Sequence, residues 1–364
     1  MSEHGQDRRA RITAALLTWY DQNRRDLPWR EDPRPYEVWV SEIMAQQTRM
    51  DVVIPYFHRF LERFPTLGDL AAASVDDVLP LWAGLGYYSR AHHLHTAARR
   101  VVENHGGQIP DDLSGLLALP GIGPYTAGAI LSIAFGQPVA AIDGNVKRVF
   151  ARLENCREEQ ESVSFRNDVQ VFVEALIPAD RPGAFTQAMM ELGALVCVPR
   201  VPRCGACPLQ SDCLGFGSGQ PETLPRRAPK AKPRKQAMTV LLVEDDRGRL
   251  LLHQRQQRLL QGMWVYHLVE GRLDRQAIDR ELCRLGLTVR SVRSAGTARH
   301  VFSHLIWEME GHYVRVASGR APQEGVWVER PAWRSLALPA AVGGFTRWLD
   351  KEQNICGLAG DGSV

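Results

Sequence analysis

Four cysteines crowd one short segment of this chain, with the spacing Cys197-x6-Cys204-x2-Cys207-x5-Cys213. The other three cysteines are scattered, so the odd total of seven does not resemble a disulfide framework. Four thiolates at this density hold either a tetrahedral zinc ion or a cluster of four irons and four sulfurs. The uneven loops are unlike the paired Cys-x2-Cys arms of a zinc ribbon, so the spacing favours the cluster but leaves zinc open.

Length and composition are those of an ordinary globular protein. The 364 residues predict two or three domains, and 45% hydrophobic with 23% charged residues argues against disorder along the whole chain. No run of about 18 apolar residues is present, and the N-terminus is polar, so we expect an intracellular protein without a transmembrane helix. The net charge of +3 is by itself weak support for a nucleic-acid partner.

The apolar pattern changes from helical to strand-like after residue 224, which predicts an all-helical domain over 1–224 and an α+β domain over 237–360. The connecting residues 225–236 contain six basic residues, three prolines and no acid. They predict an extended linker that is either only solvated or also contacts phosphates. Helices are predicted over 38–53, 75–85, 91–102, 127–141 and 274–285. Strands are predicted over 238–243, 250–253, 312–316 and 326–329, with Val301 also of strand character.

Two glycines, Gly121 and Gly123, flank one apolar residue within the stretch 119–130. They predict a tight turn between two helices. Backbone N–H groups exposed by such a turn, at the start of the next helix, bind a DNA phosphate without reading the base sequence. An ordinary corner between helices explains the two glycines equally well.

Two acids have neighbours that suit catalysis. Glu42 lies in an apolar stretch with Trp39 and Ile43, and partial burial there raises a carboxylic acid's pKa, as a general acid requires. Asp143 precedes the two bases Lys147 and Arg148 within a few residues. It either caps the next helix or is a carboxylate held in a cleft.

Taken together, the hairpin, Asp143 and the cysteine spacing resemble the helix-hairpin-helix DNA glycosylases of the endonuclease III superfamily. The stretches 41–48, 85–90 and 143–146 narrow the resemblance to the MutY-type adenine DNA glycosylases, with five motifs in the family's order between about residues 19 and 213. The C-terminal half resembles that family's second domain, which is similar to Nudix hydrolases. The fold expected is therefore an all-α helix-hairpin-helix glycosylase with an iron–sulfur cluster loop over 197–213, followed by an α+β Nudix-like domain.

The resemblance also implies an activity. The expected enzyme works in base-excision repair and hydrolyses the N-glycosidic bond of adenine opposite 8-oxoguanine or guanine in double-stranded DNA. It implies one [4Fe-4S] cluster ligated by the four clustered cysteines. We further expect a monomer in the cytoplasm, associated with the nucleoid through DNA.

Roles for individual residues follow from the same resemblance. Glu42 becomes the acid that protonates adenine at N7 and then activates water, and Asp143 the carboxylate that stabilises the cationic sugar, a division of labour like that of glycosidases. Tyr125 and Asn145 support this pair. The remaining positions are expected to contact DNA or the flipped adenine: Trp29, Arg30, Gln47, Tyr87, Gly121, Gly123, Lys147, Gln187, Phe302, Ser303 and His304. Of these, Gln47 and Tyr87 match the residues that wedge into the base stack, and Phe302, Ser303 and His304 match the loop that senses 8-oxoguanine.

Three alternatives remain at this point. A Nudix hydrolase would bind magnesium through paired glutamates, but here Arg284 and Leu285 replace them in the stretch 280–286, so no magnesium requirement is expected. A bifunctional endonuclease III-like glycosylase and lyase would place a nucleophilic lysine where this chain has Tyr125. A DNA-binding iron–sulfur protein without catalysis would need neither Glu42 nor Asp143.

Overall fold

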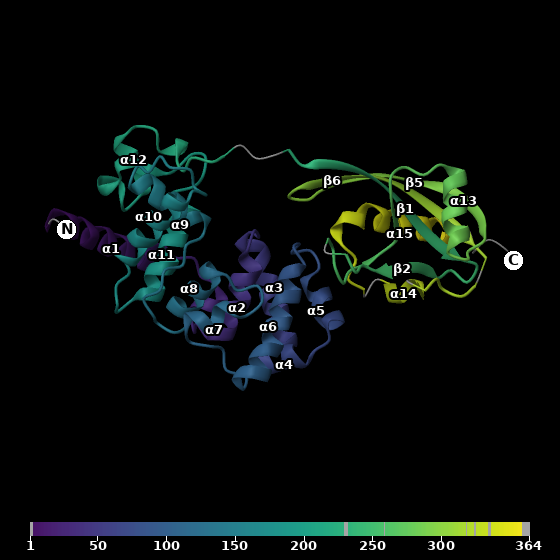
Figure 1. Ribbon diagram of the computed structural model, residues 1–364, viewed down its shortest axis with the longest axis horizontal. Helices are drawn as coiled ribbons and strands as arrows, with labels where there is room; N and C mark the ends of the chain where they lie inside the picture. Colours follow the sequence, from purple (N-terminus) through teal and green to yellow (C-terminus); the bar gives the residue numbers. More distant parts are fainter. Residues whose placement is uncertain are drawn as a thin grey trace. The chain divides into compact units, whose positions relative to one another are not determined.

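The computed structural model of this protein describes residues 3–228, 232–257, 259–317, 319–323, 325–333 and 336–358. Two compact units are present, which we describe separately. The first comprises 1–72 and 93–229, and the second comprises 73–92 and 230–364. The course of the chain through both is drawn in Figure 1. No helix of the described residues is both long enough and apolar enough to cross a membrane.

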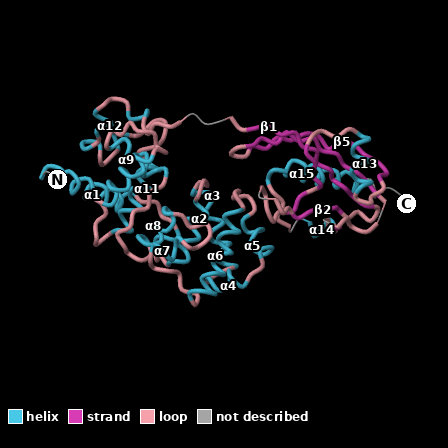
Figure 2. Tube along the Cα trace, in the orientation of Figure 1, coloured by secondary structure: helices cyan, strands magenta, loops and turns pink. Residues whose placement is uncertain are grey.

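The chain up to Thr223 is helical, as the apolar pattern predicts, and all strands of the described residues lie further on (Figure 2). Side chains at helix starts accept backbone N–H bonds, for example Ser74, Asp112 and Ser162. The α-helices are α1 (Glu3–Asn23), α2 (Pro35–Ala45), α3 (Met50–Arg63), α4 (Leu67–Ala72), α5 (Val75–Trp82), α6 (Ser89–His105), α7 (Leu113–Leu117), α8 (Pro124–Ile133), α9 (Gly144–Leu153), α10 (Val163–Glu174), α11 (Pro182–Leu195) and α12 (Leu214–Gly217). The 3-10 helices are η1 (Pro28–Arg30), η2 (Cys204–Ala206), η3 (Gln210–Asp212) and η4 (Pro221–Thr223).

The core of the first unit lies where α1, α9, α10 and α11 meet. Buried side chains from all four helices fill it, including Leu16, Phe150, Phe165 and Phe185. Backbones also approach closely here, since a Cβ on Gly193 of α11 would lie 2.5 Å from the Cβ of Asn145. This approach brings the start of α9 against α11.

Two predicted helices have the wrong boundaries. The expected helix over 38–53 is split into α2 and α3, because Gln47 adopts a left-handed backbone with φ of 58° and breaks the helix between them. The expected helix over 127–141 ends at Ile133, and residues 134–143 run as a loop through Gly136, whose φ is 65°. The helices predicted over 75–85 and 91–102 correspond to α5 and α6.

A mixed seven-stranded sheet organises the second unit. Its central strands β1 and β6 pair in parallel along their whole length, and β5 pairs antiparallel with β6. The remaining strands add antiparallel, β2 and β4 to β1, and β3 and β7 to β2. The strands are β1 (Arg234–Asp245), β2 (Leu250–Gln254), β3 (Trp264–Val265), β4 (His267–Glu270), β5 (Val289–Val301), β6 (Leu305–Val316) and β7 (Val326–Val328). The helices are α13 (Arg275–Arg284), α14 (Arg330–Trp333), η5 (Ala340–Val342) and α15 (Gly343–Leu358).

Alternate residues of β1 face opposite sides of this sheet. Val240 and Leu242 join the core that includes Phe345 of α15, whereas Leu241 and Val243 join the core that includes Ile278 of α13. The period of two residues therefore buries both faces, one under each helix. The predicted fold class, helical in the first part of the chain and α+β in the second, is confirmed.

The predicted linker is shorter than expected. Residues Arg234–Gln236 already belong to β1, because they pair with residues 305–307 of β6. At the other end, the Arg226 carbonyl accepts a 3.0 Å hydrogen bond from the Gln160 N–H. Lys230 lies outside the described residues. The long strand β5 was recognised in the sequence only at Val301.

Replacing Gly128 with alanine should destabilise the first unit by roughly 1–3 kcal/mol, because a new Cβ would collide with the backbone carbonyl of Ala140. Gly68→Ala is the matched control, since its Cβ would meet only Thr66 Oγ1 at 3.6 Å. Urea denaturation of both variants checks this, and equal stabilities would contradict the close contact.

Candidate active site

Glu42 lies on the buried face of α2, within a run of buried residues from Val38 to Met44. Glu42 is only 8% exposed, although its side chain carries a carboxyl group. Burial, together with the nearby charge of Asp143, raises the pKa of Glu42 to about 7. The Tyr125 hydroxyl, which donates a hydrogen bond to Glu42 Oε2, and the Arg30 charge both oppose that rise. The carboxyl is therefore poised to hold a proton near neutral pH.

The hairpin positions Tyr125. The chain turns after α7 through Gly121, whose φ is 79° and whose Cβ would lie 2.6 Å from the His93 Cβ, so only glycine fits. Gly123 then begins α8 with Pro124 at the first helical position. One residue later, Tyr125 points its hydroxyl at Glu42 and also contacts Met190 Sδ at 3.3 Å.

Asp143 is the N-cap of α9 and also lines a large cavity, so it is both a helix cap and a carboxylate held in a cleft. Its Oδ1 accepts 2.8 Å hydrogen bonds from the N–H groups of Asn145 and Val146, and its Oδ2 accepts one of 2.6 Å from the Asn145 amide. Burial raises the pKa of Asp143 above its ordinary value, and these three bonds oppose the rise. The donors hold the carboxylate in one orientation.

Asn145 continues the contact network away from the cavity. Its Oδ1 accepts a 2.8 Å bond from Arg148, which also donates to the carbonyls of Gly193 and Cys197 at 2.7 Å each. A continuous set of hydrogen bonds therefore joins Asp143 to the backbone of the first clustered cysteine.

A cavity of about 1090 Å³ contains most of the predicted catalytic and pocket residues. It is far larger than a single purine needs, so it extends beyond a base pocket. The predicted residues that line it are Trp29, Arg30, Glu42, Gln47, Tyr125, Asp143, Asn145 and Gln187. Trp29 packs edge-on against Phe57 with ring centroids 4.9 Å apart. Lys147 is not part of this lining in the described structure and pairs instead with Glu161 at 3.4 Å.

Sequence reasoning missed one wall of this cavity. Glu191, only 1% exposed, accepts bonds from Arg25 at 2.7 Å and Arg30 at 2.9 Å. Burial alone would raise the pKa of Glu191, but the hydrogen bonds from the two arginines outweigh it and lower the pKa to about 2. The guanidinium of Arg30 also lies 5.6 Å from the Tyr20 ring. No local pattern announces this cluster, because its members are far apart in sequence.

The two predicted wedge residues share an unusual backbone. Gln47 and Tyr87 have φ of 58° and 48°, which makes them two of the four non-glycine residues with left-handed backbone in the described part of the chain. Both side chains are exposed. Residues held in this conformation cluster at functional sites. Tyr87 belongs to the second unit, where its hydroxyl lies 3.1 Å from Ser303 Oγ.

The predicted sensing loop is the turn between β5 and β6. Phe302 is half-buried and packs against Trp307 with centroids 5.0 Å apart, so it anchors the turn. Ser303 and His304 are exposed at its tip. On α13, the Nudix-like helix, Glu281 contacts His267 Nε2 at 3.0 Å and Arg284 at 2.6 Å.

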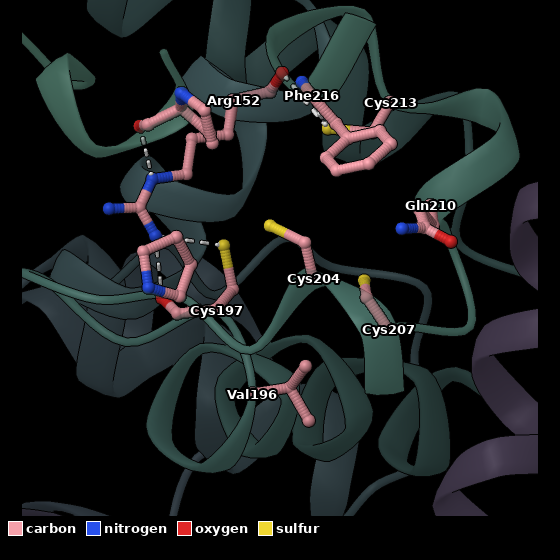
Figure 3. A pocket seen from close by; sticks show the side chains of 10 residues that line it. Arg152, Val196, Cys197, Cys204, Cys207, Gln210, Cys213 and Phe216 are labelled. Carbon is pink, nitrogen blue, oxygen red and sulfur yellow. Dashed lines mark hydrogen bonds between the residues drawn. The ribbon is translucent and has the colours of Figure 1, made fainter. Parts of the chain in front are cut away.

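The four clustered cysteines line a second cavity, and Figure 3 shows their sulfurs arranged around one space. No carboxylate or imidazole of the described part of the chain shares that lining, so the donor set is four soft thiols. Cys213 Sγ accepts the Phe216 N–H at 3.4 Å, and Cys197 Sγ accepts an Arg152 N–H at 3.3 Å, as thiolate ligands of clusters commonly do. Among the residues that the structure describes, no group of three His, Cys, Asp or Glu side chains is placed to hold a single metal ion.

Residues of α1 hold this cysteine loop in place. Arg8 donates to the Asp212 carbonyl, and Arg11 to the Asp212 carboxylate, each at 2.8 Å. Gly215 lets α12 approach α9, since its Cβ would collide with the Arg152 carbonyl.

Each half of the chain matches a known protein family. Residues 40–174 match the HhH-GPD superfamily of base excision DNA repair proteins, and residues 239–346 match the NUDIX domain. The adenine DNA glycosylase of Homo sapiens is 38% identical over 92% of this chain and 73% of its own length. Among solved structures, a thermostable thymine-DNA glycosylase is 26% identical with a TM-score of 0.53, covering 59% of this chain and 100% of its own. Endonuclease III from a non-covalent DNA complex shares the fold at 23% identity and a TM-score of 0.51, covering 60% of this chain and 99% of its own.

Glu191→Gln should lower the free energy of unfolding at pH 7 by about 3 kcal/mol, the low end for a broken buried ion pair because Arg25 is one-third exposed. The depressed pKa means that this stability is present above about pH 4.5 and is lost as pH falls towards 2. The difference in unfolding free energy between the variant and the wild type should therefore be smaller when denaturation is measured at pH 3.

Asp21→Asn is the control for that experiment. It removes the exposed pair with Arg181, which should cost less than about 1 kcal/mol. A Glu191 variant as stable as this control would show that the two arginines are held by other contacts.

Proposed function

Because this chain belongs to the adenine DNA glycosylase family and removes adenine from DNA in base-excision repair, we propose that Glu42 is its general acid and Asp143 its charge-stabilising carboxylate. The observation that carries the proposal is that both acids line one cavity, with the Tyr125 hydroxyl bonded to Glu42.

Glu42 supplies the proton. Adenine is a poor leaving group as an anion, so its departure needs a proton on the ring, which we assign to N7. A carboxyl group with a pKa of about 7 holds a proton at neutral pH and still gives it up readily. After the base departs, the resulting Glu42 carboxylate accepts a proton from the attacking water. The Tyr125 hydroxyl holds the carboxyl group in place throughout.

Asp143 faces the positive charge that develops on the sugar. A carboxylate at this point stabilises the transition state because its negative charge faces the developing positive charge from a fixed position. The N–H groups at the start of α9 and the Asn145 amide fix its direction before substrate arrives. Little reorganisation is then needed during the reaction.

The target adenine leaves the DNA stack before it is cut, which costs a few kcal/mol. We assign the filling of the gap to Gln47 and Tyr87, whose left-handed backbone and exposure suit side chains that project from a surface. Trp29, Arg30 and Gln187 line the cavity that receives the flipped base. The N–H groups near Gly121 and Gly123 contact phosphate, and Lys147 contributes positive charge near the same strand.

The second unit reads the base opposite adenine. 8-Oxoguanine differs from guanine by the oxygen at C8 and the hydrogen on N7, so a polar contact at that edge distinguishes them. Ser303 and His304 are exposed at the tip of the turn, with Phe302 anchoring it. In this proposal the Nudix-like unit binds DNA and does not hydrolyse nucleotides, because its remaining acid Glu281 is engaged by His267 and Arg284.

The four cysteines suit one [4Fe-4S] cluster better than a zinc ion. Four thiols without another ligand type surround the space, and N–H groups of Phe216 and Arg152 point at two of the sulfurs. The bound cluster would cross-link the segment 197–213, whose turns have little apolar core of their own. Iron analysis with visible absorption tests this: one zinc without iron would reverse the assignment.

The bifunctional alternative requires a lysine nucleophile. Tyr125 occupies the hairpin position where the family's lyases carry it, and the nearby Lys147 is paired with Glu161. We therefore propose a monofunctional enzyme, acting as a monomer on cytoplasmic DNA. Its abasic product strand should stay intact until alkali is added, whereas strand cleavage as fast as base removal would establish the lyase.

Glu42→Gln should retain DNA binding and lose about 10²–10⁴-fold in single-turnover adenine excision, because an amide has the same shape but delivers no proton. Wild-type excision should fall as pH rises through about 7, since the protonated form of Glu42 is lost there. The variant should lack that alkaline decline. Glu37→Gln on the same helix is the control, and a Glu42 variant that cuts as fast as this control would disprove the assignment.

Ser303→Ala should weaken the preference for 8-oxoguanine over guanine severalfold, since one neutral hydrogen bond is worth roughly 0.5–1.5 kcal/mol. Excision rates on duplexes with adenine opposite 8-oxoguanine, guanine, cytosine or thymine measure it. Ser291→Ala, exposed on β5, is the control. Tyr87→Phe removes the same hydroxyl contact but keeps the aromatic ring. If it weakens the preference for 8-oxoguanine as much as Ser303→Ala does, the loss comes from the Tyr87–Ser303 hydrogen bond and not from a contact between Ser303 and the base.

A further inference from the structure

Among the described residues, Arg152 is the only charged residue that lines the cysteine cavity, and it is 1% exposed. It lies near the end of α9, on the helix that begins with Asp143. Figure 3 shows its guanidinium beside Cys197, with a dashed line to the sulfur. A fully buried guanidinium is rare, because removing a charge from water is expensive unless an anion pairs with it.

Every hydrogen bond of this guanidinium goes to a neutral oxygen or to sulfur. The Arg152 Nε–H donates to the carbonyls of Pro221 and Leu224 at 2.8 and 3.1 Å. The two terminal nitrogens donate to the carbonyls of residues 197, 198 and 199 at 3.2, 2.8 and 2.7 Å, and to Cys197 Sγ at 3.3 Å. No carboxylate contacts it among the described residues, and none lines the cavity.

Carbonyl oxygens satisfy the donors but leave the positive charge unpaired. Within the cavity lining, the groups that are able to carry a negative charge beside Arg152 are the cysteine sulfurs. A cluster bound by four thiolates is anionic overall, and in a buried site its attraction for one guanidinium is strong. In the part of the chain that the structure describes, the neighbouring Arg148 makes no hydrogen bond to sulfur. Its Nε–H donates to the Cys197 carbonyl, and a terminal nitrogen donates to Asn145 Oδ1.

We propose that Arg152 is the buried counter-charge of the iron–sulfur cluster and donates an N–H···S hydrogen bond to it through Cys197, which makes Arg152 a positioning residue for the cofactor and sets its reduction potential. This inference rests on the cofactor assigned under the proposed function. It also gives Arg152 a second task, since the same guanidinium joins the backbone of residues 197–199 to that of residues 221 and 224.

Two substitutions separate charge from cross-linking. Arg152→Met removes both the charge and the donors. It should lower the reduction potential of the cluster, because adding an electron to an anionic group becomes less favourable without the nearby cation. Release of iron to a chelator should be about 10–100-fold faster. Arg152→Lys keeps the charge, so its potential should stay closer to wild type even though several carbonyl bonds are lost.

Arg8→Ala is the matched control. Arg8 holds the same loop through the Asp212 carbonyl and pairs with Glu154, but none of its contacts is to sulfur. It should lower thermal stability without moving the potential. If Arg152→Met and Arg8→Ala have the same potential as wild type, Arg152 is only a cross-link and the proposal is wrong.

The readouts also distinguish this proposal from the cofactor assignment. If purified wild-type protein contains no iron, the cofactor assignment itself is wrong. If wild-type protein contains the cluster and Arg152→Met leaves its reduction potential unchanged, only the role of Arg152 is wrong. If neither Arg152 variant folds, pulsed electron paramagnetic resonance on oxidised wild-type protein labelled with 15N-arginine decides the matter. A 15N coupling to the cluster is expected, and its absence would overturn the proposal.

Discussion

The backbone N–H groups that open α9 determine where Asp143 can point, and much of the site depends on that helix start. Asp143 is both the cap of α9 and a wall of the cavity, so the residue cannot move without exposing the helix terminus. Further along the same helix, Arg148 and Arg152 point to the cysteine loop. One helix of ten residues therefore positions the Asp143 carboxylate at its start and the contacts of the cysteine cavity further along.

The pKa values of two buried glutamates in one cavity are shifted in opposite directions for a clear physical reason. Glu191 accepts hydrogen bonds from two guanidinium groups, which outweigh the loss of hydration and keep it ionised. Glu42 accepts one bond from a neutral phenol, which does not outweigh burial. In the described structure, the hydrogen bonds from two arginines, which Glu191 accepts and Glu42 lacks, account for the opposite directions of the two pKa shifts.

The sequence predicted the residues that form local motifs and missed those joined only by folding. Glu42, Tyr125, Asp143 and Asn145 were recognisable from short motifs, and they share one cavity. Glu191 and Arg152 were not, since an ion pair across 166 residues or a buried guanidinium leaves no periodic signal. The helix break after α2 was missed for another reason. Gln47 adopts a left-handed backbone, which is usually found at glycine and is therefore not expected at a glutamine. Strand β5 was mostly missed because its residues are largely exposed and polar.

Gln47 and Tyr87 hold a left-handed backbone that is unfavourable by roughly 1–2 kcal/mol for a residue with a Cβ. Glycine at either position would relieve that strain and remove the projecting side chain in the same step. A library of variants selected only for heat resistance should therefore accumulate glycine at these two positions, while one selected for a low mutation rate should keep the native residues. Under the role proposed for Gln47 and Tyr87, the stability of the fold and the repair of DNA place opposing demands on the same backbone angle.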